Sequence, residues 1–185
     1  RQIVATGIVS EAAPTDSAEL RVASDRIQRE ILDILGQALT IRHVDAGSCN
    51  GCELEIHALN NPYYNLEGLG IKFVASPRHA DALLVTGPVS RNMAEALKRT
   101  YDATPDPKWV IAVGDCAACG GVFGESYASC GRVANIIPVD VSVPGCPPSP
   151  ARIQILTWSR NIPAIVARRG ARSAARSGAA RSGGA

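Results

Sequence analysis

Apolar positions recur along this chain in two different rhythms. In residues 24–39, isoleucine and leucine return every three or four positions, which is the period of a helix with one apolar face. From residue 40 onward, short runs of Val, Ile, Leu and Ala alternate with longer segments of helical period. The runs predict strands at 40–45, 71–75, 82–86, 109–113 and 136–141, and the longer segments predict helices at 53–60, 90–101 and 148–160.

Strands that alternate with helices are typical of a parallel sheet that is buried on both faces. The sequence therefore predicts an α/β fold, an open and mainly parallel sheet with helices on both faces. In such sheets ligands bind at the carboxyl ends of the strands. Three of the predicted strands are followed, at that end, by loops that contain cysteine. We expect these loops to meet at one rim of the sheet.

The same pattern divides the chain into three parts. Residues 1–39 are an N-terminal extension that contains the amphipathic helix, and residues 40–166 are the α/β domain. Residues 167–185 contain only Ala, Arg, Ser and Gly. We expect this tail to be disordered, because it has no large apolar side chains from which to build a core.

Charge is distributed unevenly over these parts. The 19 Lys and Arg and the 17 Asp and Glu give a net charge of +2, but five of the arginines lie in the tail, so the rest of the chain carries −3. Such a body lacks the clustered basic face of a nucleic-acid-binding protein, and we expect no nucleic acid partner. No run reaches the roughly 18 apolar residues of a membrane helix, and the first residues show no secretory signal.

The cysteines are the candidate chemistry, because six cysteines without a secretory signal more often bind metal than form disulfides. Cys49 and Cys52 form a C-x-x-C around Gly51, which lets the chain curl closely around the sulfur atoms. Cys146 lies in a Pro-Gly-Cys-Pro-Pro loop. The prolines stiffen that loop and hold one thiolate in place at a low cost in entropy.

The spacing of the remaining cysteines leaves alternatives open. Cys116 and Cys119 form a second C-x-x-C, and Cys130 lies in a loop without a rigid frame, which favours an ordinary buried thiol. A [4Fe–4S] cluster needs four thiolates, one per iron. Two C-x-x-C pairs are also typical of a zinc site, and a redox or structural role for the thiols is a third interpretation. Spacing alone does not decide between Cys116 and Cys119 as a ligand.

Five blocks of this sequence, in order, resemble the small subunits of [NiFe] hydrogenases. They are GSCNGCELEI from residue 47, SPRHADALLVTG from residue 76, GDC from residue 114 with GG at 120–121, IPVDV from residue 137 and VPGCPP from residue 143. The resemblance spans residues 40–160. It is greatest to the membrane-bound, energy-converting (group 4) enzymes and to the formate hydrogenlyase small subunit. The B subunit of respiratory complex I belongs to the same superfamily.

The resemblance implies a flavodoxin-like fold with one [4Fe–4S] cluster at the carboxyl-terminal rim of the strands. The ligands that carry over are Cys49, Cys52, Cys116 and Cys146, with Cys119 as a thiol beside the site. Complex I subunits have two adjacent cysteines at the first position, whereas this chain has the separated pair of the hydrogenases. Because no cysteine follows residue 160, we expect this chain to hold one cluster only.

The function that the resemblance implies is electron transfer within an oxidoreductase. The cluster would relay single electrons between a ferredoxin-like iron–sulfur subunit and the NiFe site of a large subunit, in hydrogen evolution or oxidation. The alternative is a B-type subunit of a complex-I-like quinone oxidoreductase without nickel chemistry. Membrane subunits are expected partners as well. They would hold the chain peripherally on the cytoplasmic face of the inner membrane.

Four further residues are candidates near the cluster. Arg78 and His79 follow the predicted strand 71–75 and are candidate cations that tune the cluster potential, because the resemblance implies that this loop faces the cluster and the large-subunit interface. Exposed loop charges are the alternative. Glu53 and Glu55 follow the first cysteine pair. Capping of the helix is one interpretation for them, and proton transfer or docking of the large subunit is the other, with Glu55 favoured by the resemblance.

Overall fold

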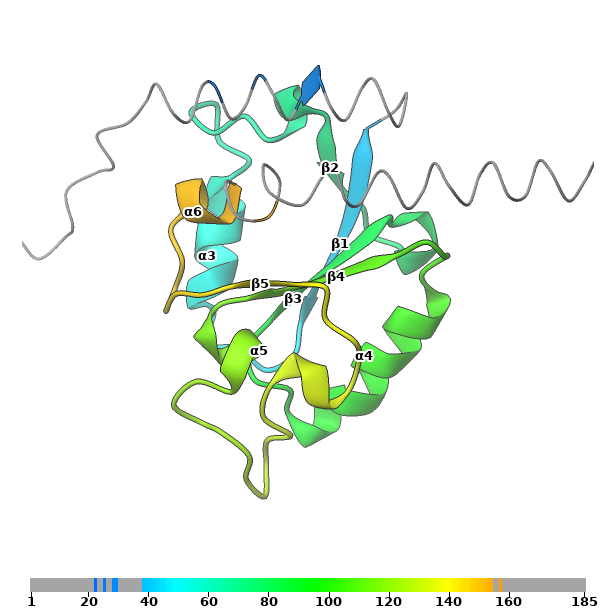
Figure 1. Cartoon of the computed structure of the whole chain (residues 1–185), viewed down its shortest axis with the longest axis vertical. Coiled ribbons are helices and arrows are strands. Elements are labelled where there is room, and N and C mark those ends of the chain that lie inside the picture. The colour runs from blue at the N-terminus through cyan, green and yellow to red at the C-terminus, as the bar shows by residue number, and fades with distance from the viewer. Residues whose placement is uncertain (1–21, 23–24, 26–27, 30–37, 155–156, 158–185) are drawn as a thin grey trace, which may run out of the picture.

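The structure is a computed structural model that describes residues 38–154, together with residues 22, 25, 28, 29 and 157. At its centre five parallel strands are ordered β2-β1-β3-β4-β5 (Figure 1). The predicted α/β fold with a parallel sheet is thereby confirmed. The strands are β1 (Leu39–Asp45), β2 (Ile71–Phe73), β3 (Ala82–Thr86), β4 (Trp109–Val113) and β5 (Val141–Val143).

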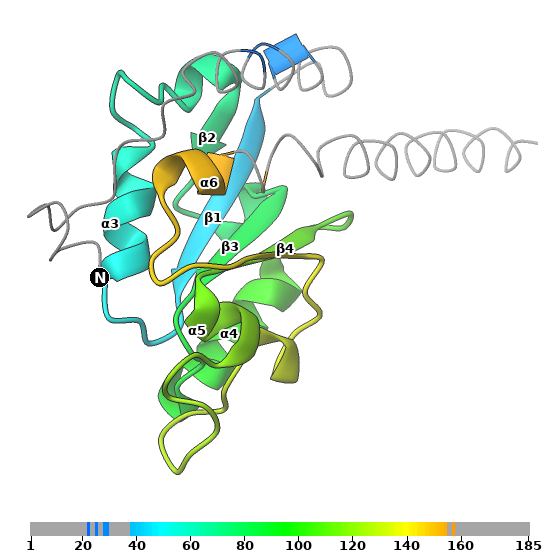
Figure 2. The same ribbon diagram turned by 60° about the vertical axis from the view of Figure 1, so that its left-hand side comes forward.

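Helices cover both faces of this sheet. On one face, α3 (Gly51–Ala58) and α6 (Pro150–Gln154) pack over the strands (Figures 1 and 2). On the other face lie α4 (Arg91–Ala103) and α5 (Asp115–Cys119). Short 3-10 turns complete the connections, and they are η1 (Glu67–Leu69), η2 (Pro77–His79) and η3 (Val133–Asn135).

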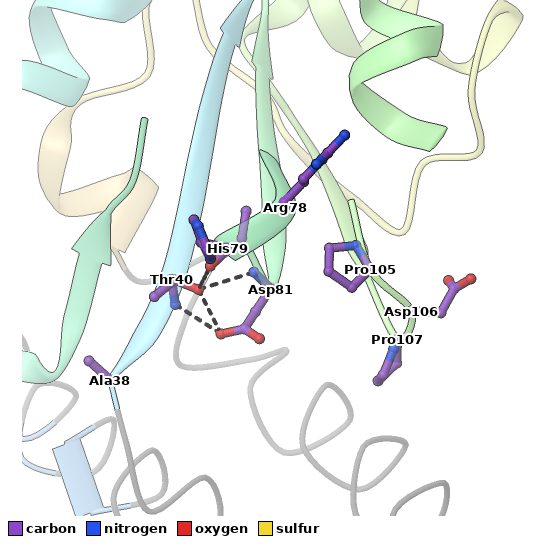
Figure 3. Close-up of a pocket in the computed structure, with 9 residues that line it drawn as sticks. Ala38, Thr40, Arg78, His79, Asp81, Pro105, Asp106 and Pro107 are labelled. Atoms are coloured by element: carbon purple, nitrogen blue, oxygen red, sulfur yellow. Dashed lines mark hydrogen bonds between the residues drawn. The ribbon is translucent and has the colours of Figure 1, made fainter. Parts of the chain in front are cut away.

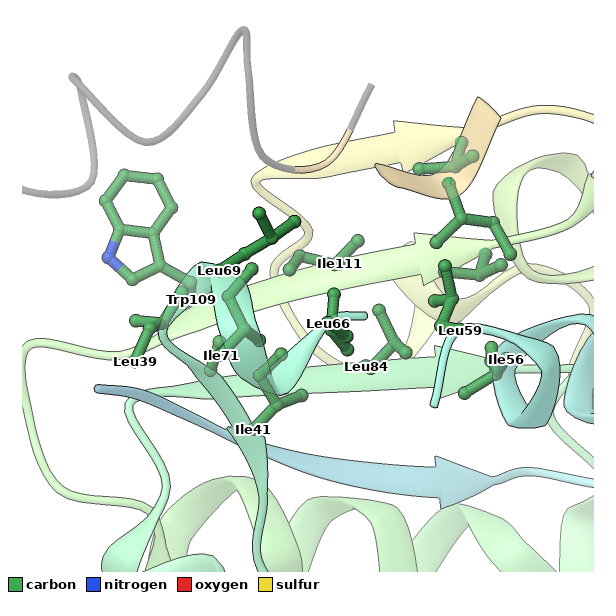
Figure 4. Packing of buried hydrophobic residues seen from close by; sticks show 14 residues of the cluster. Leu39, Ile41, Ile56, Leu59, Leu66, Leu69, Ile71, Leu84, Trp109 and Ile111 are labelled. Carbon is green, nitrogen blue, oxygen red and sulfur yellow. The ribbon is translucent and has the colours of Figure 1, made fainter. Parts of the chain in front are cut away.

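The core explains why the central strands read as continuous apolar runs. Every residue of β3 and of β4 is buried, because successive side chains point to opposite faces and both faces are covered. Leu84 joins the cluster under α3 and α6, which Figure 4 shows, and Leu83 joins the cluster under α4. Each fully buried leucine contributes about 1.5–3 kcal/mol.

Two predicted strands differ from the observed ones. β2 ends at Phe73 rather than at residue 75, and the last strand is β5 (Val141–Val143) rather than 136–141. The apolar residues that suggested a strand before Val141 do not enter the sheet. Ile137 packs into the cluster under α4 instead, and the neighbouring Pro138 has no N–H to give to a ladder.

The predicted helices are found with shifted ends. α3 begins at Gly51, two residues earlier than expected, and α4 begins after Ser90, which sits at the N-cap without a side-chain capping bond. α5 occupies a segment that the sequence predicts to be a loop. α6 is described only as far as residue 154, so the rest of the predicted helix 148–160, apart from residue 157, lies outside the described residues.

Little of the two ends of the chain is described by the structure. Most of the predicted helix 24–39 and all of the tail 167–185 lie outside the described residues. Leu39, the last residue of that predicted helix, is instead the first residue of β1, where it is buried and pairs with Ile71. In the described part of the chain, no helix is both long and apolar enough to cross a membrane.

Candidate iron–sulfur centre

Three loops that contain cysteine meet at the carboxyl ends of the strands. Cys49 follows β1, Cys116 follows β4 and Cys146 follows β5, and parallel strands place these loops at the same rim. Two backbone hydrogen bonds join the last two loops, since Gly114 N donates to Val143 O at 2.8 Å and Asp115 N donates to Gly145 O at 2.8 Å. The convergence that the periodicity predicts is therefore present in the structure.

Glycines at this rim let the backbone pass close to the sulfur atoms. A methyl group at Gly114 would lie 2.6 Å from Cys52 Sγ, and one at Gly121 would lie 2.8 Å from Cys116 Sγ. Both glycines have a positive φ, 90° and 56°, which side chains rarely allow. Gly114 and Gly121 thus form a cradle around the thiols of Cys52 and Cys116, because a side chain at either glycine would occupy the space that the sulfur atom needs.

The thiols lie close enough together to raise one another's pKa. Burial, then Glu53, and then the sulfur atoms of Cys116, Cys49 and Cys146 together raise the pKa of Cys52 to about 12. Burial, followed by the neighbouring Cys146 and Cys49, also raises the pKa of Cys116. Four thiolates in this space repel one another and require cations to balance them. The donor set of four free thiols therefore fits a [4Fe–4S] cluster, which takes one thiolate per iron.

The other two cysteines have different surroundings. Cys119 is exposed at the end of α5, where its thiol donates a hydrogen bond to the Asp115 carbonyl at 3.1 Å, and its charge contributes to the raised pKa of Cys116. It therefore lies near Cys116. Cys130 is half-buried against the cluster under α4, in agreement with its interpretation as an ordinary thiol.

An aspartate that the sequence reasoning missed shapes the first cysteine loop. Asp45 Oδ1 accepts hydrogen bonds from the N–H groups of Gly47 and Ser48, both at 2.8 Å. Burial alone would raise the pKa of Asp45, but these two N–H donors outweigh it and the pKa is lowered. An Asp two residues before a Gly at the end of a strand is typical of such a turn, so the signal was available in the sequence.

Glu53 lies in the interior beside the cysteines. Its side chain is 8% exposed, and among the described residues neither carboxylate oxygen has a hydrogen-bond partner. His43 faces it, with Nε2 at 3.8 Å from Glu53 Oε1 and at 3.0 Å from Thr86 Oγ1. Burial lowers the pKa of His43 even though Glu53 opposes that shift. Glu53 lies in the first turn of α3 but forms no capping hydrogen bond, whereas Glu55 is half-buried in the same helix.

Glu53 and His43 line a cavity of about 420 Å³ between α3 and the edge of β1. The cavity exists because β2 pairs with β1 only as far as Phe73, while β1 continues to Asp45. Arg42 and His57 line it as well. Charged and titratable side chains thus gather on the α3 side of the cysteine rim, at a position that the sequence pattern did not reveal.

Arg78 and His79 lie at the opposite end of the strands from the cysteines. They belong to η2, where the His79 carbonyl accepts a hydrogen bond from Thr40 Oγ1 at 2.6 Å. Together with Pro105 they line a cavity of about 480 Å³ at the amino ends of the strands (Figure 3). The expectation that this loop faces the cysteines is therefore wrong. After Phe73 the chain runs back to the amino end of β3 and carries η2 with it. The apolar pattern of the sequence does not show this path.

No group of three or more His, Cys, Asp or Glu side chains within the described residues is arranged as ligands of a single metal ion. A [4Fe–4S] cluster makes a different demand, because each iron binds its own thiolate. Cys49, Cys52, Cys116 and Cys146 offer four free thiols, from the segments that follow β1, β4 and β5.

Two known hydrogenase subunits are similar to this chain in sequence. The chain is 48% identical over 139 residues to the probable membrane-bound hydrogenase subunit mbhJ of Pyrococcus furiosus, which is 75% of this chain and 83% of that protein. It is 45% identical over 125 residues to formate hydrogenlyase subunit 7 of Escherichia coli, which is 68% of this chain and 49% of that protein. The chain therefore spans about half the length of this second relative.

A solved structure is similar as well. It is that of the membrane-bound sulfane sulfur reductase (MBS), an archaeal respiratory membrane complex, with 31% sequence identity and a TM-score of 0.59 over 76% of this chain and 75% of that chain. Residues 49–157 match the family model described as "NADH ubiquinone oxidoreductase, 20 Kd subunit". That match covers more than half of the sequence and contains all four cysteines of the rim. The chain therefore belongs to the NADH ubiquinone oxidoreductase 20 Kd subunit family and, like its hydrogenase relatives, is a subunit of an oxidoreductase.

Proposed function

We propose that this chain is the electron-transfer small subunit of a multisubunit [NiFe] hydrogenase. It would hold one [4Fe–4S] cluster on Cys49, Cys52, Cys116 and Cys146. Electrons would pass one at a time between a ferredoxin-like iron–sulfur subunit and the nickel site of a large subunit. The observation that carries this proposal is the convergence of four free thiols from three loops at one rim. The hydrogenase relatives favour this assignment over other members of the family.

When bound, a [4Fe–4S] cluster accepts and releases one electron at a time. The residues of the chain hold the thiols and set their surroundings. Asp45 fixes the turn before Cys49 through two N–H groups, and Gly114 leaves room for the Cys52 sulfur. Glu53 is buried next to Cys52, and a negative charge there would favour the oxidised state of a cluster held at this position.

Apolar side chains near the cysteines support the docking of a large partner. On the loop after α5, Val122 is 95%, Phe123 59% and Tyr127 93% exposed, and Leu54 on α3 is 62% exposed. Large apolar side chains that stay exposed together mark protein interfaces. We assign this surface to the NiFe-containing large subunit. Further partners would be membrane subunits, which would hold the chain peripherally on the cytoplasmic face of the inner membrane, since the first relative is named membrane-bound.

Proton transfer is proposed for the carboxylates of α3. Glu55 is half-buried and Glu53 is buried beside His43, so both lie within one or two turns of the cysteine loop. Glu55→Gln in the assembled complex should slow hydrogen turnover while the iron content stays that of the wild type. Unchanged turnover would rule out this role for Glu55.

A second candidate function is supported by the family itself. The matching family model is that of an NADH ubiquinone oxidoreductase subunit, and the similar solved structure is named a sulfane sulfur reductase. A B-type subunit of a complex-I-like quinone oxidoreductase without nickel chemistry is therefore the alternative. The sequence of the neighbouring large subunit separates the two, because two C-x-x-C pairs there would indicate nickel and their absence would favour the alternative.

The ligand assignment is tested by two matched variants in the anaerobically purified complex. Cys146→Ser should abolish both the EPR signal of the reduced cluster and hydrogen turnover, because it removes one of the four thiolates. Cys130→Ser changes the same atom in a thiol that packs against the cluster under α4 and is not among the four proposed ligands, and it should leave both readouts unchanged. The opposite result would refute the assignment.

A further inference from the structure

Asp115 and Gly145 join two of the cysteine loops by a reciprocal pair of hydrogen bonds. Asp115 N donates to Gly145 O at 2.8 Å, and Gly145 N donates to Asp115 Oδ1 at 2.8 Å. Asp115 directly precedes Cys116, and Gly145 directly precedes Cys146. The two bonds therefore connect the residues next to two of the thiols, although these residues are thirty positions apart in the chain.

The backbone at Gly145 leaves little freedom in this arrangement. Its φ is +143°, and a methyl group there would lie 2.6 Å from Pro148 Cα. The carboxylate of Asp115 is half-buried at the start of α5, in the residue that directly precedes Cys116. The Asp115 side chain thus holds the two cysteine loops together and places a carboxylate beside Cys116.

We propose that Asp115 is a positioning residue that holds Cys116 and Cys146 at the separation that the cluster requires. Oδ1 supplies the acceptor that keeps the two loops together, and the negative charge of the carboxylate lowers the potential of the centre. This inference rests on the proposed function, in which both cysteines are cluster ligands.

The same pair of strands contains a matched control at its other end. Asp140 N donates to Val110 O at 2.9 Å, and Val110 N donates to Asp140 Oδ2 at 3.0 Å, again between residues thirty positions apart. This second pair of bonds joins β4 to the residue before β5, far along the strands from the cysteine loops. Asp140→Ala therefore removes a bond of the same kind without touching the rim.

The experiment compares Asp115→Ala, Asp115→Asn and Asp140→Ala with the wild type in the anaerobically purified complex. Loss of iron to a chelator should be about tenfold or more faster in Asp115→Ala, because one hydrogen bond to a charged group is lost. Asp140→Ala should lose iron at the wild-type rate. Asp115→Asn keeps the Oδ1 acceptor and should restore cluster retention, with an EPR spectrum close to that of the wild type.

Redox titration separates the two effects of the carboxylate. Asp115→Asn should have a more positive midpoint potential than the wild type, because the negative charge near Cys116 is gone, whereas Asp140→Ala should not shift it. The proposal is overturned if Asp115→Ala retains iron as well as Asp140→Ala, or if Asp115→Asn loses iron as fast as Asp115→Ala. A wild-type complex whose subunit contains no cluster would instead refute the proposed function.

Discussion

The cradle around the Cys52 thiol can be tested by replacing Gly114 with alanine. Gly114 has φ 90° and ψ 158°, a backbone conformation that is almost confined to glycine. The new methyl group would lie 2.6 Å from Cys52 Sγ, and the next nearest atom is Gly145 O at 3.5 Å. The sulfur atom at the end of a side chain is therefore the group that has to move.

The cost has two parts. A backbone of this kind costs about 1–3 kcal/mol for a residue other than glycine, and an extra methyl group in a packed site costs about 1–3 kcal/mol. If Cys52 keeps its place, unfolding becomes easier by about 2–6 kcal/mol, as the sum of these two terms. If the sulfur rotates away, only the backbone cost remains, but Cys52 then leaves the other thiols and iron binding is lost.

Gly124→Ala is the control for backbone strain alone. Gly124 has φ +52°, and an added methyl group would meet no heavy atom within 4 Å. Its cost should be about 1–2 kcal/mol, with normal iron content. Urea unfolding and iron analysis of the three full-length proteins give both quantities. Equal unfolding free energies and equal iron contents for the two variants would refute the role of Gly114 in making room for the thiol.

Three further predictions concern the surroundings of the site. Glu53→Gln should leave the unfolding free energy unchanged or raise it by about 1 kcal/mol, because a buried carboxylate without hydrogen-bond donors is replaced by a neutral amide; a clear loss would show that the carboxylate has a favourable partner. The pKa values of His43 and Asp45 are lowered in the folded chain, so the unfolded chain binds more protons and stability should fall on acidification, for His43 below about pH 6.5 and for Asp45 near pH 4. Thermal unfolding between pH 8 and pH 5 should show this fall in the wild type and a smaller one in His43→Gln, whereas a rise toward pH 5 would contradict it. Cys119→Ser should keep its iron and Cys116→Ser should lose it, since only the second removes a ligand, and the reverse result would exchange their roles.

The central strands could be predicted because burial on both faces leaves a direct trace in the sequence. β3 and β4 are runs of five buried residues with the bounds that the apolar pattern gives. β5 could not be predicted in this way. Ile137 is as apolar as a strand residue, but it packs under α4 before the strand begins, and only tertiary packing decides between these two uses of an apolar run.

The candidate site could likewise be predicted only in part. The cysteine loops could be predicted to converge, because each follows a strand and parallel strands end at one rim. The choice of Cys116 over Cys119 needed the resemblance to a family. The bonds of Asp115 to Gly145 join loops that are distant in sequence. The point where β2 ends depends on its pairing with β1, and it places Arg78 and His79 at the amino ends of the strands. Neither feature has a local signal.

The central claim is that the four thiols at this rim hold a [4Fe–4S] cluster. Metal analysis and EPR of the anaerobically purified complex, with this subunit as wild type and as Cys146→Ser, test it most directly. The account predicts that the variant loses four iron atoms per subunit and one cluster signal of the reduced complex, since each of the four irons binds one of the thiolates. A wild-type subunit that carries zinc instead, or a variant with unchanged iron content and spectrum, would contradict it.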